Sequence, residues 1–122
     1  MTFPAVPEAP SKPEVSDIDA TQMTVSWSRP KSDGGAPITG YYVEQQESTS
    51  TRWVKINKKP VSETTLQVKD LTKGSKYQFR VSAENKAGVG PESEPSDIFL
   101  AKPPYGEFTE MKDGGLSRDF KV

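Results

Sequence analysis

The longest patterned stretch of this chain carries an apolar side chain at every second position from residue 77 to residue 83. These side chains are Tyr77, Phe79, Val81 and Ala83, with polar residues between them. A period of two places alternate side chains on opposite faces of a β-strand, one buried and one in contact with water. The glycine-rich segment 85–90 follows as a hairpin turn. The stretch therefore predicts a strand with one buried face.

A second motif lies immediately before this strand. Leu71 is followed by a turn that contains Gly74, and Tyr77 then opens the strand. This order is typical of a tyrosine corner, in which the phenol hydroxyl bonds to the backbone just upstream and fixes a crossing between two sheets. The motif favours a β-sandwich.

Six further segments show the same period or a short apolar run bounded by turn residues. They are 13–18, 23–27, 38–47, 52–57, 64–68 and 96–101. With the strand at 77–83 they make seven short strands, separated by turn signals every ten or so residues. No helical period and no long apolar run interrupts them. The pattern predicts an all-β fold, a seven-stranded immunoglobulin-like sandwich.

Four positions in this pattern make the resemblance more specific. Trp27, Tyr41, Leu71 and Tyr77 resemble the landmark residues of a fibronectin type III domain, and the likeness covers residues 11–102. The segments 33–41, 52–57 and 83–90 are also similar to the fibronectin type III repeats of giant muscle proteins, namely titin, twitchin and myosin-binding protein C.

Composition at the two ends predicts the domain organisation. Residues 1–10 have a proline at every third position from Pro4, so we expect a proline-rich, extended linker before a domain at 11–102. Residues 103–122 begin with two prolines and have no helix or strand period. They are predicted to be a C-terminal linker or disordered tail, with a regulatory segment for a neighbouring kinase domain as the alternative.

Charge and residue types exclude several classes of function. The chain has 16 basic and 17 acidic residues, and the Lys58-Lys59 pair is too short for a basic patch, so we expect no nucleic-acid partner. It has no cysteine and no Asn-x-Ser/Thr acceptor, which favours a cytoplasmic setting. Residues 1–5 do not resemble a signal peptide, and no segment has the length or apolarity of a membrane span.

Residue types also argue against an enzyme. The chain contains no histidine and no cysteine, so the commonest general base and the thiol nucleophile are missing. The segment 88–93 starts like a dinucleotide-binding fingerprint, but it follows a strand with no helix after it and is better interpreted as a hairpin turn. Asp17 and Asp19 are interpreted as solvated charges rather than metal ligands. We expect no catalytic, cofactor or metal site.

Binding surfaces are harder to exclude. The chain has no Arg-Gly-Asp and no Trp-Ser-x-Trp-Ser sequence, so integrin binding of that kind and a hormone-receptor role lose their support. Gly34 and Gly35 are interpreted as a turn rather than a recognition loop. Tyr42 and Trp53 are the candidate partner surface. Either they form an exposed aromatic patch or Trp53 caps the sheet locally, and the sequence leaves both open.

A seven-stranded sandwich crosses its own length an odd number of times, so the chain enters at one pole and leaves at the other. Strands at about 3.3 Å per residue make a module roughly 30 Å tall. The resemblance implies a non-catalytic spacer, load-bearing element and interaction platform in a giant muscle protein of the sarcomere. It also implies neighbouring immunoglobulin-like or fibronectin type III domains and the myosin thick filament as partners, and a monomeric isolated domain. An adhesion-receptor or receptor-phosphatase repeat and a regulatory flank of a kinase are the alternatives.

Overall fold

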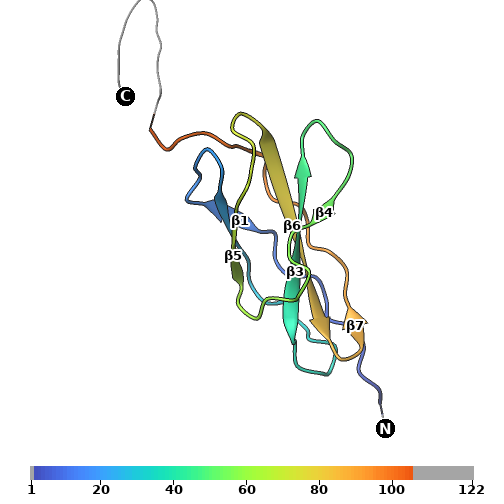
Figure 1. The fold of residues 1–122 in the computed structure, drawn as a ribbon. Helices are drawn as coiled ribbons and strands as arrows, with labels where there is room; N and C mark the ends of the chain where they lie inside the picture. The colour runs from blue at the N-terminus through green and yellow to red at the C-terminus, as the bar shows by residue number, and fades with distance from the viewer. Residues whose placement is uncertain (1, 106–122) are drawn as a thin grey trace, which may run out of the picture.

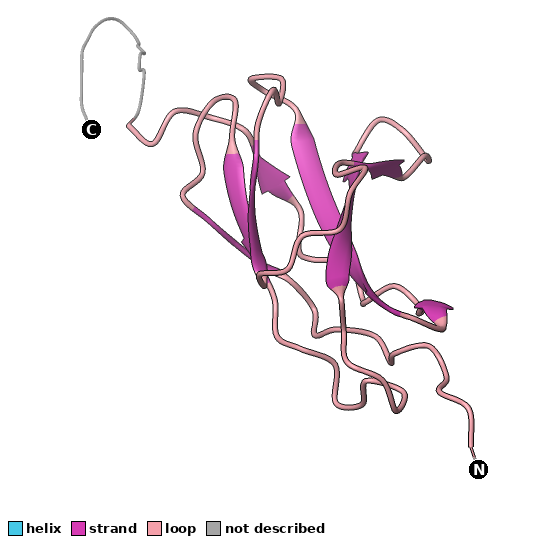
Figure 2. Cartoon of the chain, turned by 60° about the horizontal axis from the view of Figure 1, so that its bottom comes forward, coloured by secondary structure: helices cyan, strands magenta, loops and turns pink. Residues whose placement is uncertain are grey.

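In the computed structural model, the described residues 2–105 form two antiparallel β-sheets packed face to face, without a helix (Figures 1 and 2). One sheet has the order β1-β2-β5 and the other the order β4-β3-β6-β7, with β8 also pairing with β6. The predicted all-β sandwich is confirmed. The strands are β1 (Glu14–Ser16), β2 (Met23–Ser26), β3 (Gly40–Glu47), β4 (Val54–Lys55), β5 (Thr65–Val68), β6 (Lys76–Asn85), β7 (Gly88–Val89) and β8 (Phe99–Leu100).

The core lies between the sheets and follows directly from the two-residue period. On β6 the alternate side chains predicted to be buried are at most 3% exposed; they lie beside buried side chains of β3 in the same sheet and face those of β2 and β5 in the other sheet. Trp27, Leu71 and Ala101, which lie outside the strands, also belong to this cluster. Its other members are Met23, Val25, Tyr41, Val43, Val68, Tyr77, Phe79, Val81 and Ala83.

The structure has eight strands where the sequence predicts seven. β8 lies within the predicted strand 96–101, and the additional short strand β7 lies within the segment 85–90, which the sequence predicts to be a turn; both pair with β6. Pro91 and Pro95 lie between β7 and β8, and proline cannot donate to a ladder. Ser93 and Ser96 replace the missing ladder. Their amides donate to the carbonyls of Val81 and Phe79 at 2.7 Å, and their hydroxyls accept from the amides of the same two residues at 2.9 Å. The pairing with β6 therefore continues through two backbone and two side-chain hydrogen bonds.

β4 is shorter than the predicted strand 52–57 for a similar reason. The side chain of Asn57 takes the place of backbone beside β3, since its Oδ1 accepts from the Val43 amide at 2.8 Å and its Nδ2 donates to the Tyr41 carbonyl at 2.9 Å. Backbone pairing resumes only at the isolated bridge between Tyr41 and Val61. Asn57 thus holds the loop after β4 against the sheet.

Residues 4–10, which we call the N-terminal strap, lie within the segment predicted to be a linker, and they contact the sandwich. Pro7 is fully buried, and the Ala5 amide donates to the Gly34 carbonyl at 2.8 Å. The strap passes so close that a Cβ at Gly34 would lie 2.2 Å from the Ala5 carbonyl oxygen, and one at Gly90 would lie 2.0 Å from that of Pro7. Both positions therefore need glycine.

The side chain of Asn85, at the end of β6, fixes the strap by hydrogen bonds. Its Nδ2 donates to the carbonyls of Ala5, at 2.8 Å, and of Asp33, at 2.7 Å, while its Oδ1 accepts from the Ala87 amide at 2.8 Å. One buried side chain, 3% exposed, joins the strap, the β2–β3 loop and the β6–β7 turn.

The described chain begins at one end of the long axis of the sandwich and leaves it at the other (Figure 1). Residues 106–122, which make up most of the predicted C-terminal linker or tail, lie outside the described residues.

Candidate interaction face

The four landmark positions lie in the interior rather than on a binding surface. Trp27 and Tyr41 are 6% and 2% exposed, and their rings meet edge to face with centroids 5.5 Å apart. The Thr72 amide donates to the Tyr77 hydroxyl at 2.8 Å, which is the hydrogen bond of a tyrosine corner. The Leu71 amide donates to the Thr21 carbonyl at 2.9 Å, so the corner ties the two sheets together.

The outer face of the larger sheet carries the polar half of the alternation. Cross-strand neighbours on β3 and β6 form matched pairs there, with Tyr42 opposite Ser82, Glu44 opposite Arg80 and Gln46 opposite Gln78. The last two pairs bond directly. Arg80 Nε donates to Glu44 Oε1 at 2.6 Å, and the Gln78 amide donates to that of Gln46 at 2.6 Å. These half-buried contacts fix the side chains of the face.

The two aromatic residues predicted as a partner surface lie on this face, but each is covered by a cation. The Lys55 ammonium lies 4.2 Å from the Tyr42 ring centroid, and the Arg80 guanidinium lies 4.3 Å from that of Trp53. The Tyr42 hydroxyl also donates to Glu84 at 3.3 Å. Desolvation raises the pKa of Tyr42, with further contributions from the charge and hydrogen bond of Glu84. Both rings are half-buried and belong to separate cation–π pairs.

A basic feature that the sequence interpretation dismissed lies beside these rings. Arg52 and Lys55 lie on the same margin of the sheet as the Lys58-Lys59 pair. β4 and the loop after it, which Asn57 fixes against β3, place all four residues there. All four side chains are exposed, and no acidic residue occurs between positions 48 and 62. The absence of acid over 15 positions was the sequence signal for this surface, which we call the basic edge.

The structure also locates the residues considered for other chemistry. Gly88 and Val89 form β7, paired with β6, so the resemblance to a phosphate loop ends there. Asp17 and Asp19 occupy the β1–β2 turn, where Asp19 accepts from the Ala20 amide at 2.6 Å. Among residues 2–105 no three histidine, cysteine, aspartate or glutamate side chains gather as metal ligands. That part of the chain also has no helix able to cross a bilayer.

Comparison with known proteins gives a consistent result. The family model of the fibronectin type III domain matches residues 8–99. Human myomesin-2 is 40% identical over 120 residues, which cover 91% of this chain and 8% of that protein. Mouse cardiac-type myosin-binding protein C is 34% identical over 106 residues, covering 87% of this chain and 8% of that protein. The chain thus spans less than a tenth of the length of these relatives.

Solved structures show the same likeness. Domains A168–A170 of titin match with a TM-score of 0.78 and 39% identity, over 81% of this chain and 33% of that one. A structure of the titin kinase and its flanking domains matches with a TM-score of 0.75 and 40% identity, over 80% of this chain and 17% of that one.

Proposed function

The chain belongs to the fibronectin type III family, and from that premise we propose that it is a spacer and load-bearing module of a multi-domain muscle protein. Its relatives are muscle proteins many times its length, so a module of this size serves as one bead among many. Neighbouring immunoglobulin-like or fibronectin type III domains are its expected direct partners, in the myofibril.

The observation that carries this proposal is the arrangement of the two ends. The chain enters and leaves at opposite ends of the long axis (Figure 1), so tension on the termini acts along the sandwich. The strap makes the N-terminal end stiff, because backbone hydrogen bonds from Ala5 to Gly34 and from Glu8 to Ser32, of 2.8 and 3.0 Å, hold it to the β2–β3 loop. A fixed exit direction is what a spacer needs to set the angle of the preceding domain.

Single-molecule pulling on a tandem array of the chain tests this role. Each domain should unfold in one step that releases roughly 30 nm, since about 100 residues extend by about 3.3–3.6 Å each. Asn85→Ala should lower the unfolding force, because it frees the strap through which the load enters, whereas the exposed Lys86→Ala should leave the force unchanged. Gradual extension without a force peak in the wild-type array would refute load bearing.

The thick filament is the wider partner that we propose, on the basis of similarity to a myosin-binding protein. Co-sedimentation of the full chain with purified myosin filaments measures this directly. Binding at tens of micromolar that saturates would support it, and recovery of all the chain in the supernatant would restrict the module to contacts with its neighbours in the same polypeptide.

A regulatory flank of a kinase is a second candidate, favoured by the likeness to a structure that contains a kinase with its flanking domains. The polypeptide that follows residue 122 in the parent protein discriminates between the two. A kinase domain there would support the flank, and another sandwich would support the spacer.

A further inference from the structure

The basic edge consists of Arg52, Lys55, Lys58 and Lys59. Within the described residues none of the four makes an ion pair, and Lys55 alone has a partner, the ring of Tyr42. Val54 lies among them with 51% of its surface exposed. The bond from Asn57 Nδ2 to the Lys59 carbonyl, at 2.8 Å, fixes the backbone of the loop. The edge is therefore a preorganised strip of positive charge with an apolar residue in it.

The opposite edge of the same sheet has the complementary chemistry. Glu92, Glu94 and Asp97 lie exposed on the segment between β7 and β8, and a groove of about 510 Å³ joins Asp97 to Glu14 and to the apolar Val15 and Phe99. We call this the acidic edge; its exposed apolar residue is Ile98, at 54%.

One lysine lies within the acidic edge and reduces its charge. Lys12 Nζ pairs with Asp97 at 2.9 Å, and that hydrogen bond and charge raise the pKa of Lys12. The edge has four carboxylates, on Glu14, Glu92, Glu94 and Asp97, and one ammonium, on Lys12. Three negative charges therefore remain unmatched.

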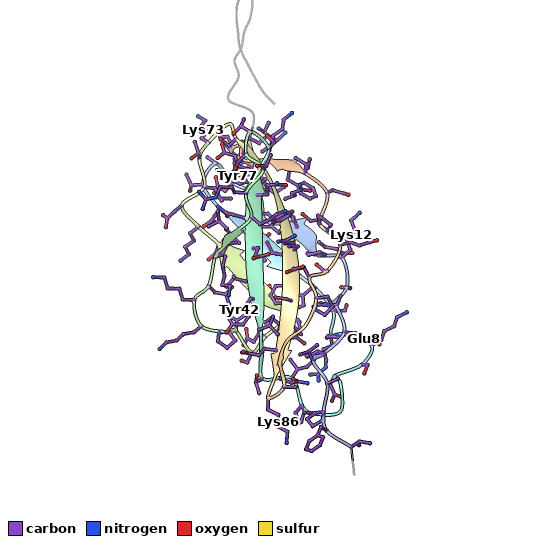
Figure 3. All side chains as sticks on the ribbon, turned by 90° about the vertical axis from the view of Figure 1, so that its right-hand side faces the viewer. Glu8, Lys12, Tyr42, Lys73, Tyr77 and Lys86 are labelled. Atoms are coloured by element: carbon purple, nitrogen blue, oxygen red, sulfur yellow. The ribbon has the colours of Figure 1, made fainter. Side chains whose placement is uncertain are left out.

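The two edges face away from each other. β4 is the first strand in the order of the larger sheet, and the β7–β8 segment borders β6 on the side remote from β3. Figure 3 shows Tyr42 on one flank of the sandwich, and Lys12 and Glu8 on the other. Because the edges are separated by the width of the sheet, one copy can present both at once to two neighbours.

We propose that two copies of this module associate laterally, with the basic edge of one against the acidic edge of the next. Four like charges on one margin oppose a symmetric pairing of two β4 strands, whereas the opposite margin attracts them. The groove beside Val15 and Phe99 offers Val54 of the neighbouring copy an apolar site. The contact goes beyond the spacer role, since it arranges modules side by side rather than end to end.

The same surface is poorly suited to nucleic acid. Single-stranded nucleic acid binds on free aromatic faces, but Lys55 and Arg80 already cover Tyr42 and Trp53. The chain carries one more acidic than basic residue, so no broad positive field surrounds the strip.

The association is weak in isolated modules and becomes appreciable in arrays. Exposed ion pairs contribute little each and are screened by salt, so a dilute single domain stays monomeric at physiological ionic strength. The contact joins different surfaces of identical chains and does not close on itself. Parallel arrays of modules form many such contacts at high effective concentration, which makes lateral alignment of neighbouring molecules its natural setting.

Sedimentation velocity of the full chain, from about 0.05 to 1 mM, tests the proposal. In 50 mM NaCl the sedimentation coefficient should rise with concentration, and in 300 mM NaCl the apparent dissociation constant should be about tenfold weaker or more, because screening shortens the reach of the charges. The double variant Lys58→Glu, Lys59→Glu should remain monomeric in both salts. The matched control Lys31→Glu, Lys69→Glu has the same net charge at exposed sites off the edge, and should associate like the wild type.

A mixing experiment identifies the second surface. The variant Glu92→Lys, Glu94→Lys should also be monomeric alone, and mixing it with Lys58→Glu, Lys59→Glu should restore association, because each then offers the charge that the other lacks. Urea melts of every variant must match the wild type, so that lost association is not lost folding. A wild type that stays monomeric at 1 mM in 50 mM NaCl, or a control that behaves like Lys58→Glu, Lys59→Glu, overturns the proposal. Tight binding of duplex DNA by the monomeric wild type would instead identify the basic edge as a nucleic-acid site; none of these results would affect the pulling test.

Discussion

Asn85 provides the sharpest test of how the strap is held. The side chain is 3% exposed and makes three hydrogen bonds of 2.7–2.8 Å to backbone groups of three separate segments. Each such bond contributes about 0.5–1.5 kcal/mol, and a buried group left unpaired costs about 1–3. Asn85→Ala should therefore lower the free energy of unfolding by about 2–4 kcal/mol, a large share of the total for one domain.

Urea unfolding measures this loss as a change in midpoint at constant slope. Hydrogen exchange adds a local readout, because the Ala5 amide, which donates to Gly34, should lose protection when the strap is released. Lys86→Ala is the control, since Lys86 is exposed and should change stability by less than about 0.5 kcal/mol.

A second substitution separates the two ends of the Asn85 amide. Asn85→Asp keeps an acceptor for the Ala87 amide, but it places a carboxylate oxygen, which cannot donate, against the two carbonyls that accept from Nδ2 in the wild type. At neutral pH it should cost at least as much as Asn85→Ala. Near pH 3 the protonated carboxyl donates to one carbonyl, so its deficit relative to the wild type should shrink. An Asn85→Ala loss below about 1 kcal/mol, with the Ala5 amide still protected, would refute the role given to this side chain.

Three further predictions concern the core. Tyr77→Phe should lower the free energy of unfolding by about 1–2 kcal/mol, because it leaves the Thr72 amide without its acceptor. Tyr41→Phe should lower it by less than about 0.5 kcal/mol, since the buried Tyr41 hydroxyl has no protein partner in the described structure. Equal urea midpoints for the two variants would contradict the tyrosine corner. Trp27→Ala should cost about 3–5 kcal/mol, and a loss below about 1 in the same assay would be inconsistent with its place between the sheets. Burial raises the pKa of Tyr41, with an opposing effect from Arg29, so this phenol ionises at lower pH in the unfolded state than in the folded state. The wild type should therefore lose stability as pH rises above about 10. Tyr41→Phe should lose less stability than the wild type between pH 9 and pH 11.

The strands could be predicted from the sequence because alternation is a local property. A run such as Tyr77 to Ala83 has one apolar face that must be buried in a core, and this requirement does not depend on which strands lie beside it. The short strand β7 and the segment that joins it to β8 could not be predicted in the same way. Whether Ser93 and Ser96 replace a ladder depends on their hydroxyls meeting the amides of Val81 and Phe79, and those amides lie at least 12 positions away in the sequence.

The surfaces show the same difference between local and long-range information. The sequence identifies Tyr42 and Trp53 as outward-facing aromatic residues. It does not identify the cations that cover them, because Arg80 reaches Trp53 from β6, a strand far along the sequence. The strap resembled a free linker since its prolines favour an extended chain. Two glycines let the strap approach the sandwich: Gly34 lies 29 positions from Ala5, and Gly90 lies 83 positions from Pro7, the residues whose carbonyls approach them most closely.

The proline-interrupted last strand would matter for refolding if the module bears load as proposed. After unfolding, identical or similar modules in one polypeptide lie at high local concentration, and strands exchanged between them are a characteristic failure of repeat proteins. Pro91 and Pro95 cannot donate to a foreign ladder, and the segment 91–96 pairs only with a strand whose amides are in register with the hydroxyls of Ser93 and Ser96. A terminal strand built in this way can return to its own β6 but makes a poor guest in the sheet of a neighbour.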